Sequence, residues 1–168
     1  MNRLHVRMAF FWLLVAIPVA TAAQAPLAPL ATVPELDVSR YVGTWHQVAH
    51  FPNRFQADCV GETTADYSLL PDGRLRVRNR CRLADGTFDE ARGVARRNAA
   101  YDQPGILQVR FAPAWLSFLP RVWGDYWILA LEEDYSAVLI GTPSREYLWI
   151  LARTPTLPEP IREKLRAH

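Results

Sequence analysis

Two histidines, His46 and His50, have the four-residue spacing that brings two metal ligands together on a helix. The stretch that follows Gly43, however, is predicted to be a strand. Four residues of a strand span about 13 Å, which is too far for two ligands of one zinc ion at about 2 Å each. We therefore predict two solvent-facing histidines and no metal site.

Nucleophilic catalysis would require an activated serine or cysteine beside a base. None of the five serines lies in a Gly-x-Ser-x-Gly setting, and the sequence has no glycine-rich loop of the kind that holds a phosphate. We therefore name no catalytic residue, and we expect neither an enzyme nor a cofactor.

The N-terminus has the pattern of a secretory signal. Arg3 and Arg7 make the first residues basic, and residues 8–20 are an uncharged apolar run. Residues 20–23 have the small side chains that are typical of a signal-peptide cleavage site. The apolar run is shorter than the roughly 20 residues that cross a bilayer. We predict a cleaved signal over residues 1–22 and export to the periplasm, with association at the outer membrane left open. No cysteine lies near the cleavage site, so a lipoprotein anchor is not expected.

Bulk charge indicates no partner. The whole chain has 19 basic and 17 acidic residues, and removal of the signal takes away two arginines, which leaves 17 of each. A neutral chain has no electrostatic preference for nucleic acid. Residues 23–36, which follow the signal, are rich in proline and alanine and are predicted to be a linker or a loosely packed arm.

The clearest hairpin covers residues 63–82, with Pro71-Asp72-Gly73 as its turn. Along its second strand arginines occupy every other position, namely Arg74, Arg76, Arg78, Arg80 and Arg82. They must share one face, which is predicted to lie in water. Cys59 and Cys81 lie at the outer ends of this hairpin, and an oxidising compartment permits a disulfide between them. A reactive thiol is the alternative.

The remaining sequence is typical of an antiparallel sandwich or barrel, because short β-branched and aromatic runs are separated by turn residues. Further strands are predicted at 88–97, 105–111, 125–131, 136–141 and 145–153, which makes eight with the first strand and the hairpin. Residues 161–167 are predicted to form a short helix. The connection at 112–123 is unusually apolar. It forms either a membrane-touching lip or a flap over the barrel.

Three stretches together resemble the conserved segments of the lipocalins, most closely the bacterial outer-membrane lipocalins and apolipoprotein D. They are residues 36–51 around Gly43 and Trp45, residues 124–127 with Asp134-Tyr135, and residues 147–155. The resemblance implies an all-β, eight-stranded antiparallel up-and-down barrel over residues 37–155. A short N-terminal helical turn and a C-terminal helix over 156–168 complete it. It also implies structural roles for Gly43, Trp45 and Arg153, with the Arg153 guanidinium lying across the Trp45 indole at the closed end.

A small barrel of this kind can hold one ligand in its interior. The residues expected to bind it are mostly apolar with a few hydroxyl groups: Ala49, Phe51, Tyr67, Val77, Phe111, Trp115, Tyr126, Ile128, Tyr147 and Trp149. The resemblance therefore implies binding and transport of small hydrophobic ligands. The lining suits an acyl chain, as in fatty acids and lysophospholipids, with its polar head near the mouth.

Two other functions stay open at this point. One is an envelope assembly or stress protein that acts through its outer surface, with the arginine face docked on lipid headgroups. Against it stands the simpler interpretation of that face as a solvated outer wall. The other is a barrel enzyme that acts on a bound lipid, since some relatives of the lipocalins use an interior cysteine as a nucleophile.

Overall fold

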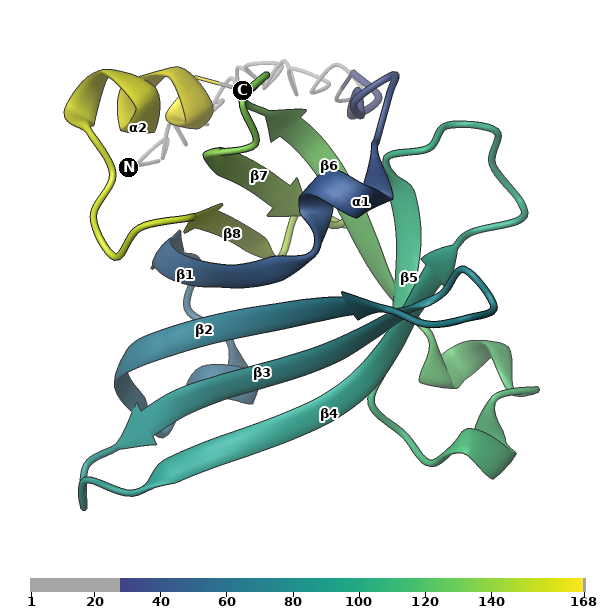
Figure 1. The fold of residues 1–168 in the computed structure, drawn as a ribbon, viewed down its shortest axis with the longest axis horizontal. Helices are drawn as coiled ribbons and strands as arrows, with labels where there is room; N and C mark the ends of the chain where they lie inside the picture. Colours follow the sequence, from purple (N-terminus) through teal and green to yellow (C-terminus); the bar gives the residue numbers. More distant parts are fainter. Residues whose placement is uncertain (1–27, 168) are drawn as a thin grey trace, which may run out of the picture.

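A computed structural model describes residues 28–167, which form a barrel of eight strands with a short helix before it and another after it (Figure 1). The strands are β1 (Gly43–His50), β2 (Cys59–Leu69), β3 (Leu75–Leu83), β4 (Phe88–Arg97), β5 (Ile106–Arg110), β6 (Gly124–Leu131), β7 (Ala137–Gly141) and β8 (Leu148–Ala152). The helices are α1 (Val38–Tyr41) and α2 (Glu159–Arg166), and single 3₁₀ turns are η1 (Arg54–Gln56), η2 (Ala114–Leu116) and η3 (Pro120–Val122). The predicted signal over residues 1–22 lies outside the described residues.

Each strand pairs antiparallel with its neighbour in sequence, and β8 pairs back with β1, so that the sheet closes on itself. In the closing pair His46 lies opposite Ala152 and His50 lies opposite Trp149. Closure gives hydrogen-bond partners to strands that would otherwise be exposed sheet edges. The predicted eight-stranded antiparallel barrel is confirmed. Within residues 28–167, no helix has both the length and the apolar character needed to cross a bilayer.

The predicted hairpin is formed by β2 and β3, in which Tyr67 lies opposite Val77 and Asp66 opposite Arg78. Gly73 in its turn has φ +80°, a conformation that glycine adopts readily, and its N–H donates to the carbonyl of Leu70 at 3.0 Å. Val77 is buried, whereas the Arg78 side chain on the opposite face is 46% exposed. The arginines of β3 therefore lie on the outer face, as the alternation predicts.

The buried apolar side chains form two clusters, one on each face of the sheet. The interior cluster includes Trp45, Tyr67, Val77, Leu107, Ile128, Ile140 and Leu151. The outer cluster lies where α2 packs against β7 and β8, and it is formed by Ala137, Leu139, Ile150, Ala152, Leu157 and Leu165. In Figure 1 α2 accordingly lies beside β7 and β8, while β2, β3 and β4 extend on the opposite side of the barrel.

The described part of the proline- and alanine-rich segment runs along the barrel. The N–H of Val33 donates to the carbonyl of Ile128 at 2.9 Å, and the side chains of Val33 and Leu36 pack against the interior cluster. Asp37 then caps α1 by accepting a hydrogen bond from the Ser39 N–H at 2.8 Å. The last residue of α1, Tyr41, is fully buried, so this short helix closes one end of the barrel.

A β-bulge interrupts β1 next to the barrel closure. Against β8, Gln47 lies opposite Leu151, but Ala49 lies opposite Ile150, so β1 has one residue more than β8 in this interval. A bulge of one residue exchanges the inward and outward positions beyond it. Ala49 consequently packs against the outer cluster, and the prediction that it lines the interior is wrong.

Candidate ligand-binding site

The closed end of the barrel is held by one arginine. The Arg153 Cζ atom lies 3.9 Å from the centre of the Trp45 ring. The same guanidinium donates to the carbonyls of Arg40 at 2.7 Å, Thr44 at 3.0 Å and Tyr135 at 3.3 Å. Gly43 has φ +98°, a conformation that glycine adopts more readily than other residues, and a Cβ atom there would lie 3.2 Å from Arg153 Nη1. Both the backbone conformation and the close approach of Arg153 favour glycine at this position. The expected arrangement of Gly43, Trp45 and Arg153 is present.

Trp45 is fully buried, and its indole N–H donates to the carbonyl of Tyr41 at 2.8 Å. The rings of Tyr41 and Trp45 have centroids 5.1 Å apart. Indole, phenol and guanidinium therefore fill the floor together, with their polar groups hydrogen-bonded. A ligand in the interior must rest above this layer.

Three tyrosine hydroxyls meet in the barrel, just above the floor. The Tyr126 hydroxyl lies 2.7 Å from that of Tyr41 and 3.0 Å from that of Tyr67. Burial raises the pKa of Tyr67 to about 12, and it holds the pKa values of Tyr41 and Tyr126 well above the usual tyrosine range. All three hydroxyls are therefore neutral hydrogen-bond donors at physiological pH.

These three tyrosines, the tyrosine triad, have one O–H donor more than the hydrogen bonds between them use. Two hydrogen bonds link three hydroxyls, and they use two of the three O–H groups. Within the described part of the chain the triad makes no other hydrogen bond. One O–H is therefore available to an acceptor on a ligand, such as a carbonyl or carboxylate oxygen.

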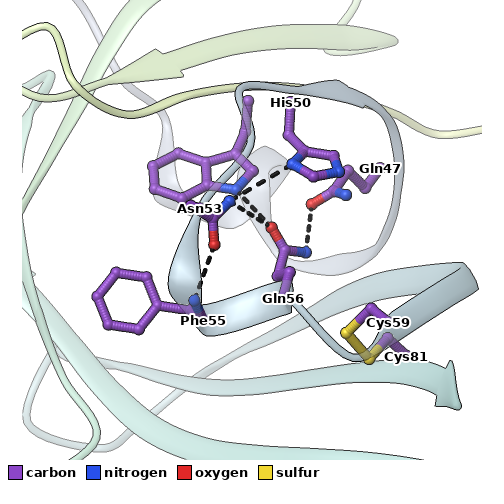
Figure 2. Close-up of a disulfide and its surroundings, with 8 residues drawn as sticks. Gln47, His50, Asn53, Phe55, Gln56, Cys59 and Cys81 are labelled. Atoms are coloured by element: carbon purple, nitrogen blue, oxygen red, sulfur yellow. Dashed lines mark hydrogen bonds between the residues drawn. A yellow bond between two sulfur atoms is a disulfide. The ribbon is translucent and has the colours of Figure 1, made fainter.

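A second polar group lies at the open end of the barrel, where η1 follows β1 (Figure 2). The Gln56 amide donates to Gln47 Oε1 at 2.7 Å, and its own carbonyl oxygen accepts from the Trp149 indole at 3.0 Å and from Asn53 at 3.0 Å. These bonds fix the orientation of the Trp149 ring. Sequence reasoning missed Gln47 and Gln56, although Gln47 shares strand parity with the inward Trp45.

The described structure places most of the predicted ligand-binding residues in the interior. Tyr67, Val77 and Ile128 are buried in the interior cluster, and the partly buried Tyr126 and Trp149 pack against it. Tyr147 stacks on Trp149 with ring centroids 5.8 Å apart. The ring of Phe111 lies next to Gly93, where an added Cβ atom would be 2.8 Å from the Phe111 Cδ1. Phe111 is 44% exposed and lies at the rim.

Two predicted ligand-binding residues lie elsewhere. Phe51, which follows the end of β1, is 47% exposed, and its N–H still donates to the Leu148 carbonyl of β8 at 2.9 Å. It therefore lies beyond the bulge on the outer face that Ala49 also occupies. Trp115 is 72% exposed and belongs to the connection between β5 and β6. With Ala49, these residues are the corrections to the predicted lining.

The apolar connection at 112–123 is fixed to the outside of the barrel by Trp123. The Arg96 guanidinium lies 3.7 Å from the Trp123 ring centre, Arg110 lies 5.3 Å from it, and the indole N–H donates to Ser117 at 2.8 Å. Trp115 and Phe118, by contrast, are 72% and 73% exposed. The connection therefore projects beside β4 and β5 (Figure 1) and does not fold over the mouth.

Cys59 and Cys81 form a disulfide between the start of β2 and the end of β3, with 5.6 Å between their Cα atoms (Figure 2). The predicted pairing is confirmed. The bond ties the hairpin at the end of the barrel that carries Gln56 and Trp149. Because both sulfur atoms are bonded to each other, neither is a free thiol that could act as a nucleophile.

His50 is exposed, and its Nδ1 lies 2.9 Å from the carbonyl oxygen of Phe51. Residues 28–167 contain no group of three histidine, cysteine, aspartate or glutamate side chains arranged to hold a metal ion. The polar chemistry of the site thus rests on hydroxyl and amide groups.

The arrangement of a plugged floor, an apolar interior and an open rim defines a class. Residues 36–168 match the family model described as a lipocalin-like domain, and the chain belongs to the lipocalin family. It is 39% identical over 137 residues to temperature-induced lipocalin-1 of Arabidopsis thaliana, a match that covers 81% of this chain and 73% of that protein.

Similarity also extends to a bacterial envelope protein. The chain is 33% identical over 150 residues to the outer membrane lipoprotein Blc of Escherichia coli, with 89% of this chain and 80% of that protein covered. Among solved structures, insecticyanin from the tobacco hornworm superposes with a TM-score of 0.64 at 19% identity, covering 86% of this chain and 78% of the other. That level of identity shows a shared fold alone.

Proposed function

We propose that this lipocalin binds acyl lipids, such as fatty acids and lysophospholipids, and carries them in the cell envelope. It acts as a binding protein and not as an enzyme, with the acyl chain in the barrel and the polar head at the rim. The proposal follows from the family, whose barrels typically bind small hydrophobic ligands, and from the shape and chemistry of this interior.

The observation that carries the proposal is a gradient of burial inside the barrel. At the floor, Trp45 and Tyr41 are fully buried, whereas the inward Tyr126, Val109 and Trp149 retain partial exposure. An inward side chain can remain exposed only where the interior is not filled. The open part of the interior is thus bounded by apolar and aromatic groups, which suits a chain of methylenes.

Energetics are consistent with reversible carriage. Burial of about 12 methylenes at about 0.8 kcal/mol each gives a gross gain of about 10 kcal/mol. Ordering of the chain and loss of its free motion cost several kcal/mol. The net affinity is then nearer to micromolar, which permits both loading and release.

An extraction and a titration test this function. Lipids extracted from the purified native protein should include acyl lipids by mass spectrometry. After delipidation, lauric acid and a lauroyl lysophospholipid should each produce a saturable change in tryptophan fluorescence. The change should be largely lost in Trp149→Phe, which removes the indole at the rim.

A barrel that is empty in the native extract and silent toward both probes would contradict the proposal. A coloured cofactor in the extract would instead favour the enzyme. Export is tested separately: N-terminal sequencing of the exported protein should find Ala23 or Gln24 as its first residue.

A further inference from the structure

The outer wall of the barrel carries a basic trough, on the opposite face of the sheet from the interior in which we propose that a ligand binds. It occupies about 620 Å³ across β2, β3, β4 and the end of β5. Its polar lining includes Asp66, Ser68, Arg76, Arg78, Arg92 and Arg110. These residues share the outer face of the sheet with Arg78. Arg78 stands opposite both Asp66 and Arg92, Arg76 stands opposite Ser68 and Val94, and Val94 in turn stands opposite Arg110.

Arg110 is the unusual member of this lining, because it is only 5% exposed. One of its Nη atoms donates to the carbonyl of Ala112, and Trp123 packs over its guanidinium. Its Nε–H finds no acceptor among the residues that the structure describes. A buried donor without a partner is costly, and most such donors in proteins are paired. Arg110 is thus a buried cation at the edge of the trough, and its Nε–H is a hydrogen-bond donor without an acceptor among the described residues.

The charges around the trough do not balance. Glu90 accepts hydrogen bonds from both Arg78 at 2.7 Å and Arg92 at 2.5 Å, so that one carboxylate serves two guanidinium groups. Asp66 accepts from the Thr44 hydroxyl at 2.6 Å. Within residues 28–167, neither Arg76 nor Arg110 forms an ion pair.

We infer that this trough is a binding site for a phosphate group. Four arginines face two carboxylates, which leaves an excess of two positive charges that a phosphate can balance. Guanidinium groups match phosphate because their N–H donors lie in a planar fork that can bond two oxygens at once. Arg76, Arg92 and the spare Nε–H of Arg110 are the donors that we assign to it.

The apolar connection beside the trough bears on the source of the phosphate. Trp115 and Phe118 are exposed in the segment that Trp123 fixes against Arg96 and Arg110. Exposed aromatic side chains next to basic ones are typical of surfaces that meet an anionic lipid headgroup. A lipid phosphate and a soluble phosphate ester share the recognised chemistry, and experiment separates them.

The first measurement uses sn-glycerol 3-phosphate as a soluble probe, in calorimetric titrations at constant ionic strength. We expect saturable binding to the wild-type protein and a loss of at least tenfold in affinity in Arg76→Gln/Arg92→Gln. The matched control, Arg54→Gln/Arg166→Gln, removes the same charge far from the trough and should bind as the wild type does. Thermal melting establishes that each variant is folded.

Arg110→Lys tests the spare donor, because it keeps the charge and removes the Nε–H and the planar fork. Affinity for glycerol 3-phosphate should fall by about tenfold, since a hydrogen bond to a charged group is of that order. If this buried substitution prevents folding, the result with Arg76→Gln/Arg92→Gln decides the matter.

The second measurement is sedimentation with vesicles of phosphatidylglycerol and phosphatidylcholine. Binding that needs phosphatidylglycerol, and that is lost in both Arg76→Gln/Arg92→Gln and Trp115→Ala/Phe118→Ala, identifies a lipid as the source. Binding of the soluble probe without vesicle binding identifies a soluble phosphate. If neither probe binds, or if the control variant loses as much affinity as the trough variant, the site does not exist as proposed.

Discussion

The guanidinium of Arg153 lies 3.9 Å from the ring centre of Trp45 and at the same time bonds three backbone carbonyls from β1, α1 and the turn before β7. Two of these contacts, with Thr44 and Arg40, join segments more than 100 residues apart in the chain. The contact between Arg153 and Trp45 therefore holds the floor of the barrel together. Loss of either side chain should lower the stability of the fold and should have little effect on ligand specificity.

Trp45→Ala should destabilise the barrel by about 3 to 5 kcal/mol, because it leaves a large cavity in a fully buried position. Arg153→Ala should also destabilise it, since it leaves the carbonyls of Arg40 and Thr44 without their donor. Urea denaturation measures both effects. Unchanged stability together with selective loss of fatty acid binding would contradict the assignment.

The disulfide should support stability without contributing to binding. It closes a loop of 22 residues, and the entropy that this cross-link removes from the unfolded chain corresponds to about 3 kcal/mol. Cys59→Ser/Cys81→Ser should therefore lower the melting temperature while lauric acid affinity changes little. Counting of thiols in unreduced, unfolded wild-type protein should find none, and two titratable thiols would refute the pairing.

The bulge in β1 makes a prediction that separates the two faces of the sheet. Val109→Phe adds volume on the inner face, where Val109 retains partial exposure, and should weaken lauric acid binding by at least tenfold with little change in melting. Ala49→Trp adds volume in the outer cluster and should lower the melting temperature by several degrees through overpacking.

Binding to Ala49→Trp should remain close to that of the wild type wherever the protein is folded. The opposite pattern, with binding abolished in Ala49→Trp and retained in Val109→Phe, would mean that Ala49 faces the ligand in the interior and that Val109 does not.

The tyrosine triad predicts a loss of stability at high pH. An unfolded tyrosine ionises near pH 10, whereas the pKa of folded Tyr67 is raised to about 12. The folded state therefore holds more protons between these values, and the free energy of unfolding should fall as pH rises, by about 1.4 kcal/mol per pH unit for each such group. This contribution is fully present below pH 10.

Urea denaturation at a series of pH values between 8 and 12 measures this slope. Tyr67→Phe should make the decline above pH 10 shallower, whereas Tyr101→Phe, which removes a 42% exposed tyrosine, should leave it unchanged. Equal slopes in all three proteins would show that the triad does not stay protonated as described.

The sequence predicted the strands well wherever side chains alternate strictly between turns. The strand expected at 88–97 is β4 with the same bounds, and the hairpin turn at Pro71-Asp72-Gly73 is in place. Such features depend on neighbours in the chain, so that local patterns suffice. The structural roles of Gly43, Trp45 and Arg153 are predicted only by the family resemblance, because no local pattern links β1 to a residue more than 100 positions later.

The errors have non-local causes. Strict alternation along the sequence places Ala49 in the interior, but the bulge in β1, which depends on the pairing of β1 with β8, places it on the outer face. The Gln47–Gln56–Trp149 network and the contact of Arg96 with Trp123 join side chains brought together only by the closed sheet. Tyr41 completes the triad from a helical turn whose direction of entry into the barrel cannot be read from periodicity.

The outer cluster under α2 gives the barrel an uneven wall. Over β7 and β8 the sheet is covered by side chains on both faces, whereas over β2, β3 and β4 one face meets solvent. Local unfolding should therefore occur more readily at β2, β3 and β4, because opening of these strands exposes less apolar surface. Amide hydrogens of β3 and β4 should exchange before those of β7 and β8. Any widening of the barrel should accordingly come from the side of β2, β3 and β4, while the side under α2 stays in place.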